Sequence, residues 1–420
     1  MSDHVIIKQS PSLCGTVTLD GAKNAILVIM ASLILTKGKS YITNVPASDD
    51  IYQMMMLLED LGATVHFSPE EKSIEVDTSS ICRQSVSPDI MKKMRASILV
   101  MGPLLARYGK AHVALPGGCL LGARPIDYHI KALRKMGAVI DVSDTHISAH
   151  AHQLKAQHFI LEYPSVGATE NIMMAATLTP GTTHIVNAAL EPEVFDLITV
   201  LKKMGAHITI THPATIIIEG VSELHPVTHA VMPDRLEAGT LLLATAITGG
   251  SITIPDIHGA LLGLLLEKLD EMGHAITLGE HERGITLHAI PNPRAISFKT
   301  MPYPGFPTDL QAPMMAVLSL ASGTSIIHET VFENRLLHIR ELQKMGAQII
   351  QEGNVATIKG VDTLYGSQVI ASDIRASAAL IIAGLAAQGQ TVMSGIHHLR
   401  RGYNNLESKI NKLGGKITVG

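Results

Sequence analysis

The sequence predicts an α/β protein made of two lobes, each with three copies of one repeat unit packed around buried helices. Three observations support this prediction. A glycine that ends an amphipathic helix recurs six times, a glycine turn leading into a strand lies about 24 residues before each one, and a nearly charge-free helix precedes each turn. Because these features divide the 420 residues into units of about 70, the whole chain is covered by one repeat.

The helix-ending glycines follow an apolar-x-x-[Leu/Met] pattern, and alternating residues typical of a strand follow each of them. Glycine is favoured there because it adopts the left-handed conformation that ends many helices. The helix-ending glycines are Gly62, Gly137, Gly205, Gly273, Gly346 and Gly414, and the glycines of the upstream turns are Gly38, Gly109, Gly181, Gly250, Gly323 and Gly389.

The helix before each turn is rich in Ala, Leu and Met, and a helix that is apolar on all sides is buried on all sides. Three such helices walled by three sheets would use about 210 residues, so two lobes are expected, with a ligand in the cleft between them. We predict these helices over residues 22–35, 94–107, 168–178, 237–248, 311–321 and 375–387.

Composition excludes several classes of protein. The net charge is −4, aromatic residues make up 3% and Trp is absent, so the basic, ring-bearing surface of a nucleic-acid-binding protein is not expected. No apolar run reaches the roughly 18 residues of a membrane span. Three cysteines without paired spacing fit a reducing compartment, which with the unremarkable N-terminus predicts the cytoplasm. Two of them, Cys14 and Cys82, stand beside apolar residues and are predicted to be buried.

Basic residues occupy the first turns of three of the buried helices, namely Lys23, Arg95 and Arg375. A cation at a helix N-terminus opposes the helix dipole, at a cost of roughly 0.3 to 1 kcal/mol. One such residue is readily explained as a solvated side chain. Three equivalent cases in one repeat family favour an oxyanion site, because helix N-termini and basic side chains both bind anions.

Cys119 lies in the most glycine-dense segment of the chain, residues 116–125, with Arg124 close behind it. Glycines indicate a loop, and nearby arginines stabilise a thiolate, so a reactive thiol is one interpretation. A small buried hydrophobe is the other. The residues alone leave both open.

Further candidates lie near the starts of buried helices or after the glycine-turn strands. Asp309 precedes a buried helix, where a carboxylate also serves as an ordinary helix cap. Arg335 and Arg401 follow strands of the last two units, and Ser165 offers a hydroxyl before another buried helix. The motifs of phosphate-loop, dinucleotide and elbow-serine enzymes are absent, and no zinc-ligand pattern occurs.

These segments together resemble the family of UDP-N-acetylglucosamine enolpyruvyl transferases, also called 1-carboxyvinyltransferases, over essentially the full length. The most specific match is Cys119 within its glycines. The segments that carry the resemblance are 21–25, 94–97, 115–119, 122–125, 165–169, 233–235, 306–309, 329–335, 375–377 and 401–403.

The resemblance implies a fold of two inside-out α/β barrel lobes, each of three βαβαββ units, with residues 22–231 in one lobe and residues 1–21 plus 232–420 in the other. It implies transfer of the enolpyruvyl group of phosphoenolpyruvate to the 3′-hydroxyl of UDP-N-acetylglucosamine, the first committed step of peptidoglycan precursor synthesis. Neither a cofactor nor a metal is expected. Sensitivity to fosfomycin is implied, and the oligomeric state is left open.

The resemblance also assigns roles to residues. Lys23, Arg124 and Arg401 would hold phosphoenolpyruvate, Cys119 would deliver a proton to C3, and Asp309 would take the proton of the sugar hydroxyl. Tyr163 stands where the family often has Lys, which weakens the expectation of a cation there. The substrate-binding residues implied for the sugar nucleotide, together with two arginines of the last two units, are Asn24, Arg95, Arg124, Pro125, Ile126, Asp127, Tyr128, Tyr163, Pro164, Ser165, Val166, Asp309, Val331, Arg335 and Arg375.

Two alternatives remain at this stage. The sister enzyme that transfers the same group to shikimate 3-phosphate shares the six-unit architecture, but the Cys119 loop belongs to the first family. A non-catalytic repeat protein that binds a sugar nucleotide is the other, and the joint presence of Lys23, Cys119, Asp309 and Arg401 argues against it.

Overall fold

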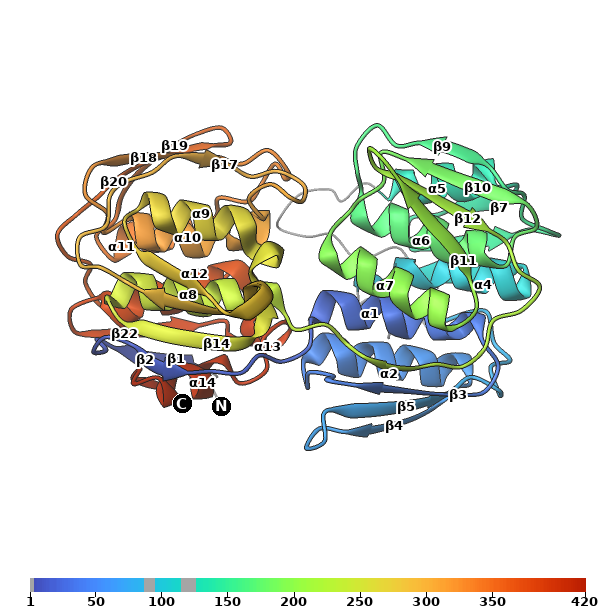
Figure 1. Ribbon diagram of the computed structural model, residues 1–420, viewed down its shortest axis with the longest axis horizontal. Coiled ribbons are helices and arrows are strands. Elements are labelled where there is room, and N and C mark those ends of the chain that lie inside the picture. The colour runs from blue at the N-terminus through green and yellow to red at the C-terminus, as the bar shows by residue number, and fades with distance from the viewer. Residues whose placement is uncertain (1–3, 87–94, 115–125) are drawn as a thin grey trace. The chain divides into compact units, whose positions relative to one another are not determined.

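The computed structural model describes residues 4–86, 95–114 and 126–420, and these divide into two compact lobes (Figure 1). The N-lobe comprises residues 21–86, 95–114 and 126–232. The C-lobe comprises residues 4–20 and 233–420. The chain therefore passes from one lobe to the other after residue 20 and again after residue 232.

Core helices fill the interior of each lobe, as their uniformly apolar sequences predict. In the C-lobe, α8, α10 and α12 pack against one another in pairs, and nearly every residue along them is buried (Figure 1). Five of the six core helices differ from the predicted ranges by at most three residues at either end, and α4 begins seven residues after its predicted start. The core helices are α1 (Lys23–Ser32), α4 (Met101–Tyr108) and α6 (Val166–Thr177) in the N-lobe, and α8 (Arg235–Thr248), α10 (Gln311–Leu318) and α12 (Ile374–Ala386) in the C-lobe.

Short 3₁₀ turns account for most of the differences in these bounds. A 3₁₀ turn (Leu33–Leu35) continues α1, another (Arg95–Val100) leads into α4, and a third (Thr308–Leu310) leads into α10. The tighter winding is common at helix ends and is not visible in hydrophobic periodicity. Within the predicted continuous helix over residues 94–107, residues 95–100 are therefore 3₁₀ and residues 101–107 are α.

A strand follows the glycine turn after every core helix, as predicted. In the residues that the structure describes, the first five of these strands each pair with an antiparallel hairpin of their own unit, the last, β22, pairs with β1, and six separate sheets result. The glycine-turn strands are β3 (Lys39–Thr43), β6 (Lys110–Ala114), β10 (Thr182–Val186), β14 (Ser251–His258), β18 (Thr324–His328) and β22 (Gln390–Ser394).

An outer, amphipathic helix separates each glycine-turn strand from its hairpin. The six predicted helix-ending glycines all have φ between 96° and 108°, a left-handed conformation that side chains resist. The outer helices are α2 (Asp49–Leu61), α5 (Asp127–Lys135), α7 (Pro192–Lys203), α9 (Gly263–Glu271), α11 (Ile339–Lys344) and α14 (Leu406–Lys412), with the short α13 (Ile396–Arg400) before the last.

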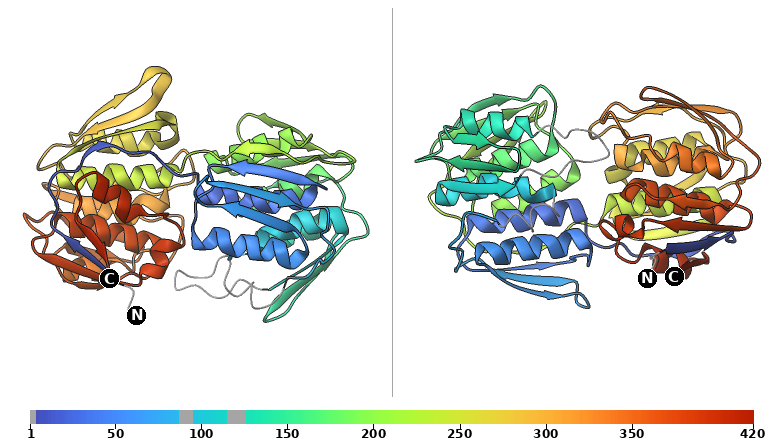
Figure 2. Two further views of the ribbon diagram at one scale, coloured as in Figure 1. Left: turned by 90° about the horizontal axis from the view of Figure 1, so that it is seen from below. Right: turned by 180° about the vertical axis from the view of Figure 1, so that it is seen from behind.

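The hairpins complete the units. Their strands are β4 (Thr64–Ser68) and β5 (Ser73–Asp77), β7 (Val139–Val142) and β8 (His146–His150), β11 (His207–Thr211) and β12 (Thr215–Glu219), β15 (Ala275–Leu278) and β16 (Arg283–His288), and β19 (Gln348–Glu352) and β20 (Val355–Lys359). In the last unit β23 (Ile417–Val419) pairs with β1 (His4–Lys8), so the first and last strands of the chain lie side by side (Figure 2).

A parallel strand closes most of the sheets, and some of these strands come from distant parts of the sequence. The edge strands β9 (His158–Ile160), β17 (Phe298–Lys299) and β21 (Gln368–Ile370) precede their own core helices. By contrast, β2 (Cys14–Thr16) pairs with β14, and β13 (Thr228–Ala230) pairs with β3. The six units are therefore confirmed, but two of the three units of the C-lobe borrow a strand from the N-terminal segment.

Two further findings bear on the sequence analysis. Cys14 and Cys82 are exposed, so the prediction that they are buried is wrong. Cys14 lies on the short β2 strand, whose three residues are all exposed, and its apolar neighbours in sequence did not reveal this. Within the described residues, no helix is both long and apolar enough to cross a membrane.

Candidate active site

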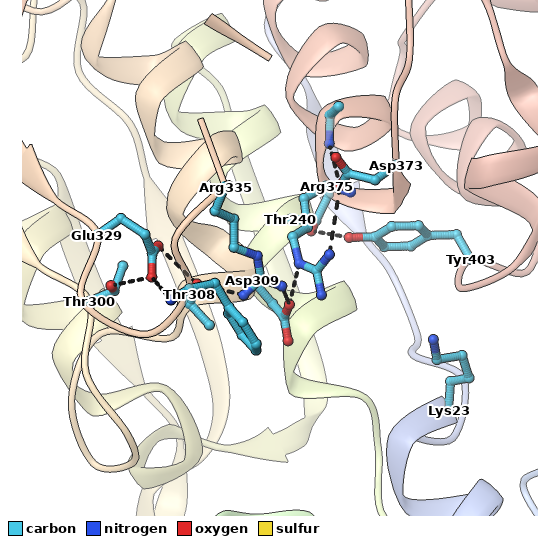
Figure 3. Close-up of polar contacts among 12 residues, drawn as sticks. Lys23, Thr240, Thr300, Thr308, Asp309, Glu329, Arg335, Asp373, Arg375 and Tyr403 are labelled. Carbon is cyan, nitrogen blue, oxygen red and sulfur yellow. Dashed lines mark hydrogen bonds and ion pairs between the residues drawn. The ribbon is translucent and has the colours of Figure 1, made fainter. Parts of the chain in front are cut away.

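Asp309 forms the centre of a charged cluster in the C-lobe. Its Oδ1 accepts a hydrogen bond from Arg335 Nη2 at 2.7 Å and a second from Arg375 Nε (Figure 3). The side chain of Asp309 is 29% exposed, and those of Arg335 and Arg375 are 3% and 17% exposed. A partly accessible carboxylate therefore contacts two largely buried guanidinium groups. The structure therefore brings together three residues that the sequence analysis singled out separately.

The core helices create this meeting point. Asp309 lies in the 3₁₀ turn that leads into α10, and Arg375 is the second residue of α12. Because α10 and α12 pack side by side, their starts place the carboxylate and the cation in contact. Asp373 caps α12, with Oδ1 accepting the backbone N–H groups of Arg375 and Ala376, so this helix start is fixed as well.

Carboxylates offset the cost of burying Arg375. Burial alone would lower the pKa of this guanidinium, but the neighbouring Asp309 and Asp373 carboxylates outweigh burial and raise the pKa. Burial likewise acts to raise the pKa of Asp373, but Arg375 and two backbone N–H groups lower it. Arg375 and Asp373 are therefore both charged at neutral pH.

Tyr403 lies near the same cluster, with its hydroxyl 2.8 Å from Thr240 Oγ1 (Figure 3). Burial raises the pKa of this phenol, and the nearby carboxylates add to the effect, so the group stays neutral. Arg401 lies two residues before it, is the residue after α13, and is partly buried. This places the predicted cation Arg401 on a segment anchored by a partly buried tyrosine.

A second set of predicted residues lies in the N-lobe. Lys23 is the first residue of α1, and its Nζ lies 3.2 Å from Asp50 Oδ2 in the first turn of α2. The two side chains are 14% and 10% exposed. The neighbouring Asn24 is exposed. Asp50 was not among the predicted residues, because a carboxylate at the start of an outer helix looks like an ordinary helix-dipole contact.

Two predicted binding runs of the N-lobe lie at the starts of helices that pack together. Residues 126–128 begin α5, and residues 163–166 lead into α6, which Ser165 caps through a 3.4 Å bond from Ala168 N. The contact is close at Gly167, where an added Cβ would lie 3.1 Å from Cε1 of His129. The structure thus brings the two runs together.

His129 is neutral in this contact. Its Nδ1 accepts a hydrogen bond from Asn171 Nδ2 at 3.0 Å, and burial lowers the pKa of the imidazole to about 4. Nε2 therefore carries the ring proton. The imidazole lies against the first turn of α6, the helix that Ser165 caps.

Several predicted residues lie outside the described parts of the chain. Cys119, Arg124 and Pro125 belong to this group. Arg95 begins the 3₁₀ turn before α4, and only its backbone is described. The roles expected for these four residues remain predictions.

Glu329 and Thr308 are the residues that sequence reasoning missed. Both lie within segments that carry the family resemblance, 329–335 and 306–309, but neither was singled out. Hydrophobic periodicity gives no signal for a buried carboxylate that is bound by hydroxyl and backbone groups. In the described ranges, no group of three or more His, Cys, Asp or Glu side chains is arranged to hold a metal ion.

Comparison with known proteins gives concordant results at the level of sequence. The family model described as EPSP synthase (3-phosphoshikimate 1-carboxyvinyltransferase) matches residues 7–410. The chain is 45% identical over 417 residues to UDP-N-acetylglucosamine 1-carboxyvinyltransferase 1 of Caldanaerobacter subterraneus, covering 99% of both chains. It is 48% identical over 403 residues to the UDP-N-acetylglucosamine 1-carboxyvinyltransferase of Dichelobacter nodosus, covering 96% of both.

Solved structures of similar fold extend the comparison. The enolpyruvyl transferase NikO from Streptomyces tendae aligns over 100% of this chain and 99% of its own, with a TM-score of 0.91 and 25% identity. EPSP synthase from Acinetobacter baumannii aligns over the full length of both chains with a TM-score of 0.77 and 18% identity, a likeness of fold alone.

Proposed function

Because the chain belongs to the family of UDP-N-acetylglucosamine 1-carboxyvinyltransferases, we propose that it transfers the enolpyruvyl group of phosphoenolpyruvate to the 3′-hydroxyl of UDP-N-acetylglucosamine. Phosphate is the second product. The observation that carries the proposal is full-length identity of 45–48% to relatives of that name. The Asp309–Arg335–Arg375 cluster adds a site with the required acid–base and anion-binding chemistry.

The reaction proceeds by addition and elimination. A proton adds to C3 of phosphoenolpyruvate while the sugar oxygen bonds to C2, and the hydroxyl proton passes to a base. Loss of a proton from C3 and of phosphate from C2 then restores the double bond. The site must therefore supply an acid for C3, a base for the hydroxyl, and cations for a phosphate and a carboxylate.

Asp309 is the proposed base. Its contacts with Arg335 and Arg375 fix the orientation of the carboxylate. An exposed fraction of 29% leaves it accessible to a substrate hydroxyl.

Cys119 is the proposed acid, and Lys23, Arg124 and Arg401 are proposed to hold phosphoenolpyruvate. The ion pair of Lys23 with Asp50 aims the ammonium group from the start of α1. Arginines suit the phosphate and carboxylate because their planar groups form paired hydrogen bonds with oxyanions. We also expect the Cys119 thiol to be alkylated by fosfomycin.

The sugar nucleotide is proposed to contact the two paired runs of the N-lobe, residues 125–128 and 163–166, with Asn24, Arg95 and Arg124. In the C-lobe it would meet Val331. The N–H of Phe332, which shares a peptide group with the Val331 carbonyl, donates to Glu329 at 3.1 Å, so that carbonyl points away from Glu329 and we expect it to face the ligand. Tyr163 would contribute its ring or hydroxyl where many relatives are expected to use a cation.

We place the reaction in the cytoplasm as the first committed step of peptidoglycan precursor synthesis, and so in cell-wall biogenesis. The lack of paired cysteine spacing agrees with a reducing compartment, and Cys14 and Cys82 are free. We propose further that the two lobes each supply part of one active site, since Lys23 belongs to the N-lobe and Asp309 to the C-lobe.

Enolpyruvyl transfer to shikimate 3-phosphate is the second candidate, because the matching family model carries that description. The full-length relatives at 45–48% identity favour the sugar nucleotide. A phosphate-release assay with phosphoenolpyruvate and each acceptor tests the choice. Turnover with UDP-N-acetylglucosamine and none with shikimate 3-phosphate is expected. The reverse result, or no turnover with either, would contradict the proposal.

A further inference from the structure

Glu329 is a buried carboxylate without a direct cation partner among its described hydrogen bonds. It is 1% exposed, and its oxygens accept four hydrogen bonds. Oε1 accepts from Thr300 Oγ1 at 2.9 Å, Val331 N at 2.8 Å and Phe332 N at 3.1 Å, and Oε2 accepts from Thr308 Oγ1 at 2.9 Å (Figure 3). A buried charge is costly unless such bonds compensate it, which suggests a purpose beyond packing.

We propose that Glu329 is a positioning residue for the base Asp309 and acts on it through Thr308 and Arg335. The inference rests on the proposed function, in which Asp309 takes the proton of the acceptor hydroxyl. Arg335 Nη1 donates to Thr308 Oγ1 at 2.6 Å, and Nη2 of the same guanidinium donates to Asp309 Oδ1 at 2.7 Å. A chain of hydrogen bonds therefore runs from Glu329 through Thr308 and Arg335 to Asp309.

The charge of Glu329 fixes the direction of this chain. An ionised carboxylate only accepts hydrogen bonds, so the hydroxyl of Thr308 must donate to it. The lone pairs of Thr308 then face Arg335, which only donates. A neutral amide at position 329 would place an N–H donor against this hydroxyl, so the Thr308 proton would lose the acceptor that holds it away from Arg335.

Glu329 holds Arg335 from a second side as well. Its Oε1 binds the backbone N–H of Phe332, and the ring of Phe332 lies 4.3 Å from the centre of the Arg335 guanidinium. Such a cation–π contact stabilises the orientation of the guanidinium plane. The carboxylate of Glu329 thus positions two groups that contact Arg335, the hydroxyl of Thr308 and the ring of Phe332.

Glu329→Gln separates the effect of the charge from that of the loop. Oε1 faces two backbone N–H groups that cannot turn, so the amide oxygen of glutamine must take that place and its NH₂ must face Thr308. The hydrogen bonds from the backbone N–H groups of Val331 and Phe332 are kept, while Thr308 loses its hydrogen-bond acceptor at position 329. Thr308→Val breaks the chain at the next link, and Thr308→Ser keeps it. Glu333→Gln removes an exposed charge from the same loop and serves as the matched control.

The test measures kcat and KM by phosphate release, with thermal melting as a check on folding. Glu329→Gln and Thr308→Val should each lower kcat at least tenfold, with KM for phosphoenolpyruvate changed less than threefold. Thr308→Ser and Glu333→Gln should stay within twofold of wild type. The Glu329→Gln/Thr308→Val double variant should be no slower than the slower single variant, because both changes cut one chain.

Other outcomes overturn the inference in distinguishable ways. If wild type turns over and both single variants match it, or their losses multiply in the double variant, the positioning role is wrong while the proposed function stands. If Glu329→Gln does not fold, the comparison of Thr308→Val with Thr308→Ser decides. If wild type releases no phosphate with UDP-N-acetylglucosamine, the proposed function fails and the inference falls with it.

Discussion

At the scale of single residues, several buried charged side chains of this protein lie in clusters of opposite charge. Asp309, Arg335 and Arg375 share one cluster, and Lys409 lies 2.8 Å from Asp20 and also contacts Glu237. Breaking such a pair strands the remaining charge and is strongly destabilising. Mutational tests of the candidate site must therefore separate lost chemistry from lost stability.

Cys119 is the residue for which the two interpretations differ most. If it is the acid, Cys119→Ser should abolish turnover, because a hydroxyl is far too weak an acid. Cys119→Asp should keep substantial activity, with a lower pH optimum, and should escape alkylation. Mass spectrometry after treatment with fosfomycin, with and without UDP-N-acetylglucosamine, should find the adduct on Cys119.

The exposed Cys14 and Cys82 provide an internal control for that experiment, since simple accessibility would modify them too. Adducts on these two in place of Cys119, or a fully active Cys119→Ser enzyme, would show that the thiol at position 119 has no acid role.

Lys23 and Arg401 are predicted to bind phosphoenolpyruvate. Replacing either residue by Ala should weaken the binding of phosphoenolpyruvate by roughly 2 to 5 kcal/mol, because each substitution removes a charge-assisted contact to a buried anion. UDP-N-acetylglucosamine should be affected far less, and calorimetry with each ligand measures the difference. Asp50→Asn is the control for Lys23→Ala, since it breaks the same ion pair but keeps the ammonium group. Equal losses for both ligands would refute the assignment.

Buried histidines predict loss of stability in acid. Burial lowers the pKa of His129, His274 and His338 to about 4, below the ordinary value of 6.5. The unfolded chain therefore binds protons first. The free energy of unfolding is therefore unaffected by the titration of these histidines above pH 6.5. It falls as the pH drops toward 4, by on the order of 3 kcal/mol for each histidine.

His274 allows a direct check away from the candidate site. Its Nδ1 accepts the N–H of Ile290 at 3.1 Å, and Asn can supply an oxygen there without titrating. Urea midpoints of His274→Asn should fall less steeply between pH 7 and pH 5 than those of wild type. His152→Asn, at an exposed position, should follow wild type. Parallel curves for all three proteins would contradict the prediction.

At the scale of elements, close contacts between helices determine which glycines can be replaced by alanine without loss of stability. Gly102 in α4 donates its N–H to Asn171 Oδ1 at 2.6 Å, and a Cβ there would overlap the backbone oxygen of Asn171 in α6. Gly263, the first residue of α9, has open space around its Cβ position and a negative φ of −42°. The same substitution should therefore have opposite effects at these two positions.

We expect Gly102→Ala to destabilise the protein by about 1–3 kcal/mol through overpacking. Gly263→Ala should be neutral or should stabilise by up to about 1 kcal/mol, since alanine loses less conformational freedom. Urea unfolding measures both variants. If Gly102→Ala were as stable as wild type, α4 and α6 would not pack as closely as described.

At the scale of the whole molecule, the proposed site draws on both lobes, so we expect substrate to bring them together. The chain crosses between lobes after residues 20 and 232. Glu237 anchors the first crossing through Asp20 N at 2.8 Å, and Asp196 anchors the second through Met232 N at 3.1 Å. Motion should therefore concentrate in the few residues between these anchors.

Small-angle scattering should show a smaller radius of gyration when UDP-N-acetylglucosamine is added. Phosphoenolpyruvate alone should leave the profile unchanged, because the sugar nucleotide is expected to bind first. An unchanged profile at saturating sugar nucleotide would argue against closure of the lobes.

The repeat, the buried helices and the glycines that end the outer helices could all be predicted from the sequence. A helix without a polar face must lie in the interior, and a left-handed backbone conformation at the end of a helix favours glycine. Both features therefore appear as local patterns in the sequence. Resemblance of short segments also selected Asp309, Arg335 and Arg375 as site residues.

Contacts between residues far apart in the chain could not be predicted in this way, because they depend on how the elements pack. Strand β2 pairs with β14, which lies more than two hundred residues later in the chain. No local sequence pattern predicts that pairing. Glu329 owes its burial and its four donors to segments that converge from positions 300, 308 and 331–332. Periodicity reports which face of an element is apolar, whereas hydrogen bonds between distant segments depend on how the elements pack, and that information exists only in the folded chain.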